Sequence, residues 1–208
     1  TIGTGWHHAV IQFTSNNKSE LWLDGKKVSE KTVSVSDNLI YGANNDLVIG
    51  GPLFHGSVDQ VSVYDNDLSS SEIKKLAHQE RIGAIPISSW EMKPSEERIS
   101  DSLSSLSGQW NSGSTAAAWN MDQGNVSTID DLTENNIDGS LINTTRVDGV
   151  SGSALNFSGD GYASLGKLNQ LSDNQKITVS SWVYPRKSVD DWQAFFGDGW
   201  QKYLFGIP

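Results

Sequence analysis

The sequence predicts an all-β protein, a two-sheet antiparallel sandwich with one short helix. Short stretches of alternating apolar and polar residues recur along the 208 residues, and Gly, Asn, Asp or Ser separate them. A period of two is typical of a strand with one buried face, and the turn formers mark the strand ends. No run of about 18 apolar residues occurs, so we expect no membrane-spanning helix.

The first strands follow this pattern most clearly. The stretch HHAVIQF alternates from His7 to Phe13, and the stretch ELWLDGKKV alternates as far as Asp24-Gly25. That dipeptide suits a type I′ turn, in which both central residues need positive φ. The polar residues TSNNKS between the two stretches are typical of a loop. Residues 6–35 therefore predict three antiparallel strands.

Two further strands and the helix follow. NNDLVIGG predicts one strand, and GSVDQVSVYDNDL predicts another, in which Asp59 shares a face with Val61 and Val63. Ser69 precedes Glu72 by three residues. This is the spacing of a capping box, in which each side chain binds the other residue's backbone N–H. We expect the helix over about residues 70–79.

We divide the chain into residues 1–82, 83–113 and 114–208. The middle part is rich in Ser and repeats a Trp-x-Met motif of the third part, so it is either a linker or a partial repeat. The third part predicts strands once more, and its adjacent Phe195 and Phe196 should point to opposite faces. The strand stretches of the third part are AAAWNM, GSLIN, SALNFSG, GYASLG, ITVSSWVYP and the aromatic pair within WQAFFGDGWQKYLFGIP.

Charge and cysteine content exclude several classes of function. The net charge of −10 argues against nucleic acid and anionic membrane surfaces as partners, because phosphates attract a basic patch. The absence of cysteine excludes disulfides, thiolate nucleophiles and zinc–thiolate sites, but it does not fix the compartment.

Two sets of motifs resemble the laminin-G-like branch of the concanavalin A-like lectin/glucanase superfamily. The first set, which in that family lies in the C-terminal half of a module, is WHHAV, LWLDG, GSVDQVSVY and LSSSEI. The second set, which lies in the N-terminal half, is WNMD, DLTENNIDG, SALNFSGDGY and ITVSSWV. The resemblance implies a jelly-roll sandwich. It covers most of the chain outside residues 83–113.

The two halves stand in reversed order. Either the chain holds the end of one module and the start of the next, or it forms one circularly permuted sandwich joined by residues 83–113. In the first case the halves could complete each other within one chain or between chains. Half a sandwich would expose an apolar face and unpaired edges, so we expect the halves to come together.

The resemblance also bears on catalysis. Hydrolases of this superfamily place their acids along one strand as Glu-x-Asp-x-x-Glu, and the chain contains no such triplet. Glu20 and Asp24 share a face but lack a third acid. The resemblance therefore implies a non-catalytic carbohydrate-binding or adhesion module of a larger extracellular or cell-surface protein. The alternatives are a spacer or polymerising module of a surface fibre and a fragment of a polysaccharide-degrading enzyme.

Candidate ligand sites come from acids and from tryptophans. A buried Asp59 must be paired or ligated, and the loop DLTENNIDG supplies further oxygen atoms of the kind that Ca²⁺ prefers. In the family resembled, a calcium ion often lies near this loop, so the predicted ligands are Asp59, Asp131, Glu134 and Asn136. The alternative is that Asp59 only accepts backbone N–H bonds.

Tryptophans near polar turns could stack on sugar rings of a glycan or polysaccharide. The predicted ligand-binding residues are Trp22, Trp192 and Trp200. The alternative is that they belong to the core, as most tryptophans in sandwiches do. Besides a glycan, the expected partners are neighbouring modules of the same protein.

Overall fold

The fold is a sandwich of two antiparallel sheets with one helix. The computed structural model describes residues 4–32, 46–51, 54–83, 115–122, 125–166, 176–186, 193–198 and 202–207. The larger sheet contains, in spatial order, β3 (Lys26–Thr32), β2 (Lys18–Leu23), β1 (His7–Thr14), β12 (Ile177–Pro185), β5 (His55–Tyr64), β10 (Ser153–Ser158) and β9 (Thr145–Asp148), and β6 (Thr115–Trp119) also pairs with β5. The smaller sheet contains β14 (Lys202–Ile207), β13 (Gln193–Asp198), β4 (Leu47–Gly50), β11 (Tyr162–Gly166), β8 (Gly139–Ile142) and β7 (Thr128–Ile129).

The first strands and the helix confirm the local sequence signals. β1, β2 and β3 form the expected meander, and Asp24 and Gly25 adopt positive φ angles of 48° and 74° in the turn between β2 and β3. The helix α1 (Ser70–Gly83) is one turn longer than expected. Its capping box is formed, because Ser69 N donates to Glu72 Oε2 at 2.8 Å and Glu72 N donates to Ser69 Oγ at 3.3 Å.

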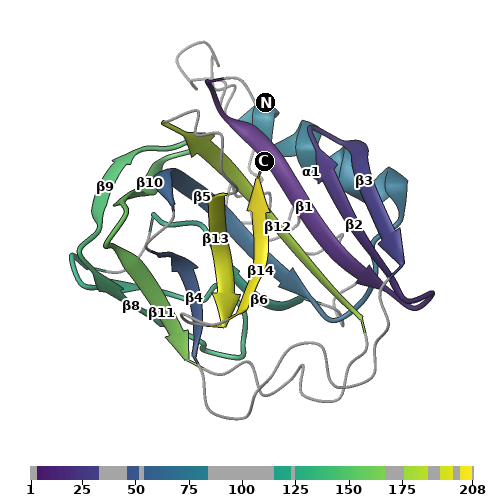
Figure 1. Ribbon diagram of the computed structural model, residues 1–208. Coiled ribbons are helices and arrows are strands. Elements are labelled where there is room, and N and C mark those ends of the chain that lie inside the picture. Colours follow the sequence, from purple (N-terminus) through teal and green to yellow (C-terminus); the bar gives the residue numbers. More distant parts are fainter. Residues whose placement is uncertain are drawn as a thin grey trace, which may run out of the picture.

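Both sheets mix strands from two parts of the chain, which we call the first segment (residues 7–83) and the second segment (residues 115–207). Figure 1 shows the blue strands β4 and β5 of the first segment lying between green and yellow strands of the second, whereas the purple strands β1, β2 and β3 form the edge of the larger sheet beside β12. Strand β5 pairs with β12, β10 and β6, and β4 pairs with β11 and β13. Every partner of β4 and β5 therefore belongs to the second segment.

The core lies between the two sheets. The inner faces of both sheets contribute wholly buried apolar side chains, so the two segments share one hydrophobic cluster. A second, smaller cluster lies on the other face of the larger sheet, where α1 covers part of it (Figure 1). This outer cluster consists of Val10, Trp22, Tyr64, Leu68, Ile73 and Leu76.

Two predictions of side-chain direction are wrong, and irregular strand pairing explains both. The pairing of β5 with β12 shifts between Ser180 and Trp182, and Gln60 has a φ of 50°, so β5 carries a bulge. Val58, Val61 and Val63 consequently share the inner core, while Asp59 points to the outer face. A shift in the pairing of β13 with β14 likewise accompanies the burial of both Phe195 and Phe196 in that core.

The structure does not describe residues 84–114. The predicted division of the chain at residues 82 and 113, and the choice between linker and partial repeat, therefore stay predictions. In the described part of the chain, the one helix is too short and too polar to span a membrane.

Because every described strand that pairs with β4 or β5 belongs to the second segment, we expect the two segments to stay together after the chain is cut between them. A protease site inserted between residues 84 and 114 and then cleaved should leave one particle of unchanged mass. Size-exclusion chromatography with light scattering measures this, and the pieces should separate only in denaturant. Two species that elute apart under native conditions would contradict the shared core.

Candidate functional site

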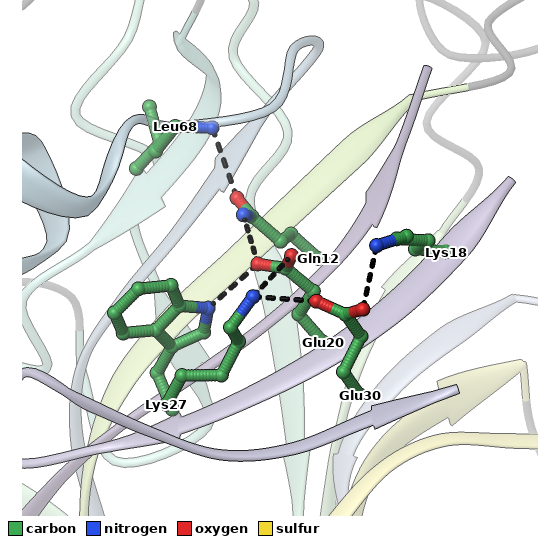
Figure 2. Close-up of polar contacts among 7 residues, drawn as sticks. Gln12, Lys18, Glu20, Lys27, Glu30 and Leu68 are labelled. Carbon is green, nitrogen blue, oxygen red and sulfur yellow. Dashed lines mark hydrogen bonds and ion pairs between the residues drawn. The ribbon is translucent and has the colours of Figure 1, made fainter. Parts of the chain in front are cut away.

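The outer face of the larger sheet carries a network around the buried carboxylate of Glu20, drawn in Figure 2. Glu20 Oε2 accepts hydrogen bonds from Gln12 Nε2 at 2.9 Å and from Trp22 Nε1 at 3.0 Å. Glu20 Oε1 accepts from Lys27 Nζ at 3.0 Å. The carboxylate is only 8% exposed, and all three donors come from strands β1, β2 and β3.

Gln12 extends this network to the helix. Its Oε1 accepts the backbone N–H of Leu68 at 2.9 Å and the hydroxyl of Thr178 at 3.2 Å. Figure 2 shows the Gln12 side chain between Glu20 and Leu68. One carboxamide thus ties β1 to β2, to β12 and to the chain just before α1, so the network positions the helix on the sheet.

The charge on Glu20 is stabilised by its partners. Burial raises the pKa of this carboxyl, but the hydrogen bonds from Gln12, Lys27 and Trp22 outweigh burial, and the net pKa is lowered. Next to it, the hydrogen bonds from Lys18 and Lys27 lower the pKa of Glu30 to about 2. Because its pKa is lowered, Glu20 carries no proton to deliver near neutral pH, and its three donors give it a structural role.

The loop 131–138 is organised by Asp131. Its Oδ1 accepts from Ala118 N and Thr133 N, each at 3.0 Å, and its Oδ2 accepts from Thr133 Oγ1 at 2.8 Å and Ile137 N at 3.0 Å. Asn136 Nδ2 donates to the Glu134 carbonyl at 2.7 Å. Asp131 is therefore fully hydrogen-bonded from within the loop and from β6.

Asp59 differs from these two acids. It is wholly buried, and its Oδ2 accepts from Val150 N at 2.8 Å and Ser151 N at 3.3 Å. Its Oδ1 is buried without a hydrogen-bond partner, the one carboxylate oxygen in that state among the described residues. Burial raises the pKa of Asp59 to about 7 against the opposing backbone bonds, and the nearby Asp122 raises it further.

Asp59 lies where β5 changes partner, a place that we call the fork (Asp59, Gln60, Met121, Asp122 and residues 149–153). β10 pairs with β5 at residues 55–58, and β6 pairs with it at residues 61–64. The chain leaving β6 and the turn entering β10 therefore meet beside Asp59. Asp122 Oδ1 accepts the N–H of Ser153 at 2.5 Å, so both carboxylates contact this turn.

The predicted set of calcium ligands does not converge. Asp131, Glu134 and Asn136 are engaged within their own loop, whereas Asp59 contacts the turn at 150–151. Among the described residues, no group of three or more His, Asp or Glu side chains could hold a metal ion. Asp59 is buried as predicted, but it contacts the turn at 150–151 and not the loop 131–139, because the bulge at Gln60 turns Asp59 to the other face.

Of the three tryptophans predicted to stack on sugar rings, the structure describes one. Trp22 is 7% exposed and packs in the outer cluster, with Lys27 Nζ 5.7 Å from its ring centroid, so it has the core position that the sequence offered as the alternative. Trp192 and Trp200 lie outside the described residues. The structure instead brings together Trp6 and Tyr184, both partly exposed, with ring centroids 5.6 Å apart and an interplanar angle of 70°. The sequence missed this pair because it forms across β1 and β12, from opposite ends of the chain.

Comparison with known proteins supports the resemblance. Residues 3–74 match the family model described as the concanavalin A-like lectin/glucanases superfamily. No curated protein and no solved structure matches the chain.

The network around Glu20 predicts a large effect for a small change. Glu20→Gln leaves one acceptor oxygen for three donors, so we expect it to lower the free energy of unfolding by about 1–3 kcal/mol. Urea denaturation at pH 7 measures this. Glu30→Gln, which also loses a contact with Lys27 but on the exposed side, should lower the free energy of unfolding less than Glu20→Gln does, because solvent screens exposed ion pairs. Equal effects of the two changes would contradict the assignment.

Proposed function

We propose that this concanavalin A-like sandwich is a non-catalytic carbohydrate-binding or adhesion module of a larger extracellular or cell-surface protein. The superfamily contains both lectins and glucanases, so the acids decide between binding and hydrolysis. The proposal rests on the ionisation of Glu20. Hydrogen bonds from Gln12, Trp22 and Lys27 hold its carboxylate in the charged form. A glycosidase needs a carboxylic acid that can protonate the leaving group.

The second acid of the same strand region is engaged as well. Asp24 Oδ2 contacts His7 Nδ1 at 2.9 Å, and its Oδ1 accepts the N–H of His8 at 3.1 Å. These contacts fix the turn after β2. Glu20 and Asp24 thus have structural partners, which supports binding over catalysis.

A buried Ser–His contact also favours binding over catalysis. His8 Nε2 lies 2.9 Å from Ser180 Oγ, but both side chains are buried, at 0% and 1% exposure. Burial lowers the pKa of His8 to about 4, against a smaller opposing effect of Asp24, so the imidazole is neutral at pH 7. A hydroxyl that no substrate can reach cannot serve as a nucleophile.

Within the part of the chain that the structure describes, the partly exposed pair Trp6 and Tyr184 offers aromatic surface to a sugar ring. Tryptophan and tyrosine rings offer apolar faces to the C–H groups of a sugar while their polar atoms stay near water. We place glycan contact at this end of β1 and β12.

A glycan array followed by isothermal titration tests the proposal. We expect a polysaccharide or glycan to bind, and Trp6→Ala to weaken binding by about 1 kcal/mol, roughly fivefold in Kd. Val126→Ala, which trims a side chain 93% exposed, is the matched surface control and should leave affinity unchanged. If no glycan binds, the proposal is wrong. If a polysaccharide is hydrolysed, the protein is an enzyme and not a binding module.

A second function, a polymerising module of a surface fibre, is favoured by the strand order. Because β4 and β5 pair only with strands of the second segment, the second segment of another copy could supply the same partners. Closed exchange would give a dimer and open exchange a fibre. At low concentration, the connection between the segments favours pairing within one chain.

Light scattering across a hundredfold dilution series distinguishes pairing of the two segments within one chain from exchange of segments between chains. A binding module that completes its own sandwich should remain a monomer throughout, because effective concentrations within one chain are in the millimolar range. A mass that grows with protein concentration, and a mixed species after two differently tagged chains are combined, would support the polymerising module instead.

A further inference from the structure

We propose that the surface around Trp6 and Tyr184 binds acidic sugars, and that Arg186 holds the carboxylate of a hexuronate ring there. The inference rests on the proposed function and names the class of sugar at the same site. It adds a charged residue to the aromatic pair, and this charge distinguishes acidic from neutral glycans.

The pairing of β12 with β5 places Arg186 beside Tyr184. Pro185, the last residue of β12, lies opposite Gly56. Arg186 N donates to the His55 carbonyl at 3.1 Å, so the pairing continues one residue past the end of the strand. Because side chains alternate along a strand, Tyr184 and Arg186 lie on the same face of the larger sheet, about 7 Å apart along the chain. The guanidinium is therefore within reach of a sugar that packs on Tyr184.

Trp6 and Tyr184 form a corner and not a flat platform. Their ring centroids are 5.6 Å apart, their planes meet at 70°, and both side chains are partly exposed. The apolar C–H face of a sugar can pack on one ring while the other ring borders it. The indole N–H and the phenol O–H can bond sugar hydroxyls. The corner thus orients the sugar ring, and Arg186 can act on a substituent at the rim of that ring.

A glycine keeps the surface next to Arg186 low. His55 is exposed, and a Cβ atom at Gly159 would come within 2.6 Å of His55 Cε1. Gly159 also has a positive φ of 101°. The imidazole therefore lies against the backbone of the turn after β10, where it adds a polar group for sugar hydroxyls.

The described acids at this end of the sheet have partners of their own. Both carboxylate oxygens of Asp24 contact residues of β1. Asp160 interacts with Ser158 at 3.2 Å and with Asn143 at 3.5 Å. Arg186 is exposed, and within the part of the chain that the structure describes its guanidinium has no hydrogen bond or ion pair. Its positive charge is therefore available to an anion from solvent.

The net charge of the chain limits the kind of anion. At −10 the protein repels a dense polyanion, and a heavily sulfated glycan would need a broad basic surface. A hexuronate has one carboxylate at the rim of its ring. The two oxygens of that carboxylate match two parallel N–H groups of a guanidinium. A single arginine beside an aromatic corner therefore favours a uronate.

A glycan array followed by isothermal titration of the whole chain tests the class of sugar. We expect glycans that contain hexuronate to bind more tightly than their neutral counterparts. Carboxyl reduction converts each uronate of a bound glycan to the neutral hexose and leaves the rings and linkages unchanged. This treatment should weaken binding about tenfold, as the loss of a charge-assisted hydrogen bond does.

Two variants that each remove one positive charge locate the contact. Arg186→Gln should weaken binding of the uronate glycan about tenfold and leave binding of the carboxyl-reduced glycan unchanged. Lys26→Gln, at an exposed position of the edge strand β3, is the matched control and should leave both affinities unchanged. Trp6→Ala should weaken both glycans alike, because stacking does not depend on the carboxylate.

The outcomes distinguish this inference from the proposed function. If no glycan binds, the proposed function is wrong and the inference fails with it. Glycan binding stands, but its assignment to a uronate held by Arg186 is overturned, if only neutral or only sulfated glycans bind. The same holds if carboxyl reduction leaves the affinity unchanged, or if Arg186→Gln and Lys26→Gln behave alike.

Discussion

The position of β5 is the constraint on which the rest of the structure depends. Among the described strands of its own segment this strand has no hydrogen-bonded neighbour, and β12, β10 and β6 of the second segment surround it. Its inner face supplies Val58, Val61 and Val63 to the common core. Removing the second segment would therefore expose two strand edges and an apolar face at once, which is why the sandwich exists only when both segments meet.

The same constraint creates the fork. Two strands share one edge of β5, and where one ends and the other begins the ladder leaves a gap in the pairing between residues 58 and 61. The bulge at Gln60 turns Asp59 outward there, and the turn at residues 149–152 folds over it. A buried charge at this place costs free energy, and burial accordingly raises the pKa of Asp59 to about 7.

The sequence was informative wherever structure is decided by nearby residues. The meander, the turn at Asp24-Gly25 and the capping box of α1 follow from period, turn chemistry and spacing, and the structure confirms them. The four donors to Asp131 also lie near in sequence, apart from Ala118, and the Asp-x-Thr pattern could have indicated a self-contained loop. Side-chain direction at Asp59 and Phe195 could not be predicted, because a bulge depends on the register of a distant strand.

The number of hydrogen-bond donors distinguishes Glu20 and Asp131 from Asp59. Burial acts on Glu20, Asp131 and Asp59 alike, and a count of buried carboxylates would rank them together. Three or four hydrogen bonds offset the loss of water around the first two, so neither needs a further partner. Asp59 has donors on one oxygen alone. Burial, with a smaller contribution from Asp122, raises the pKa of Asp59 to about 7, so below that pH this acid avoids an uncompensated buried charge by keeping its proton.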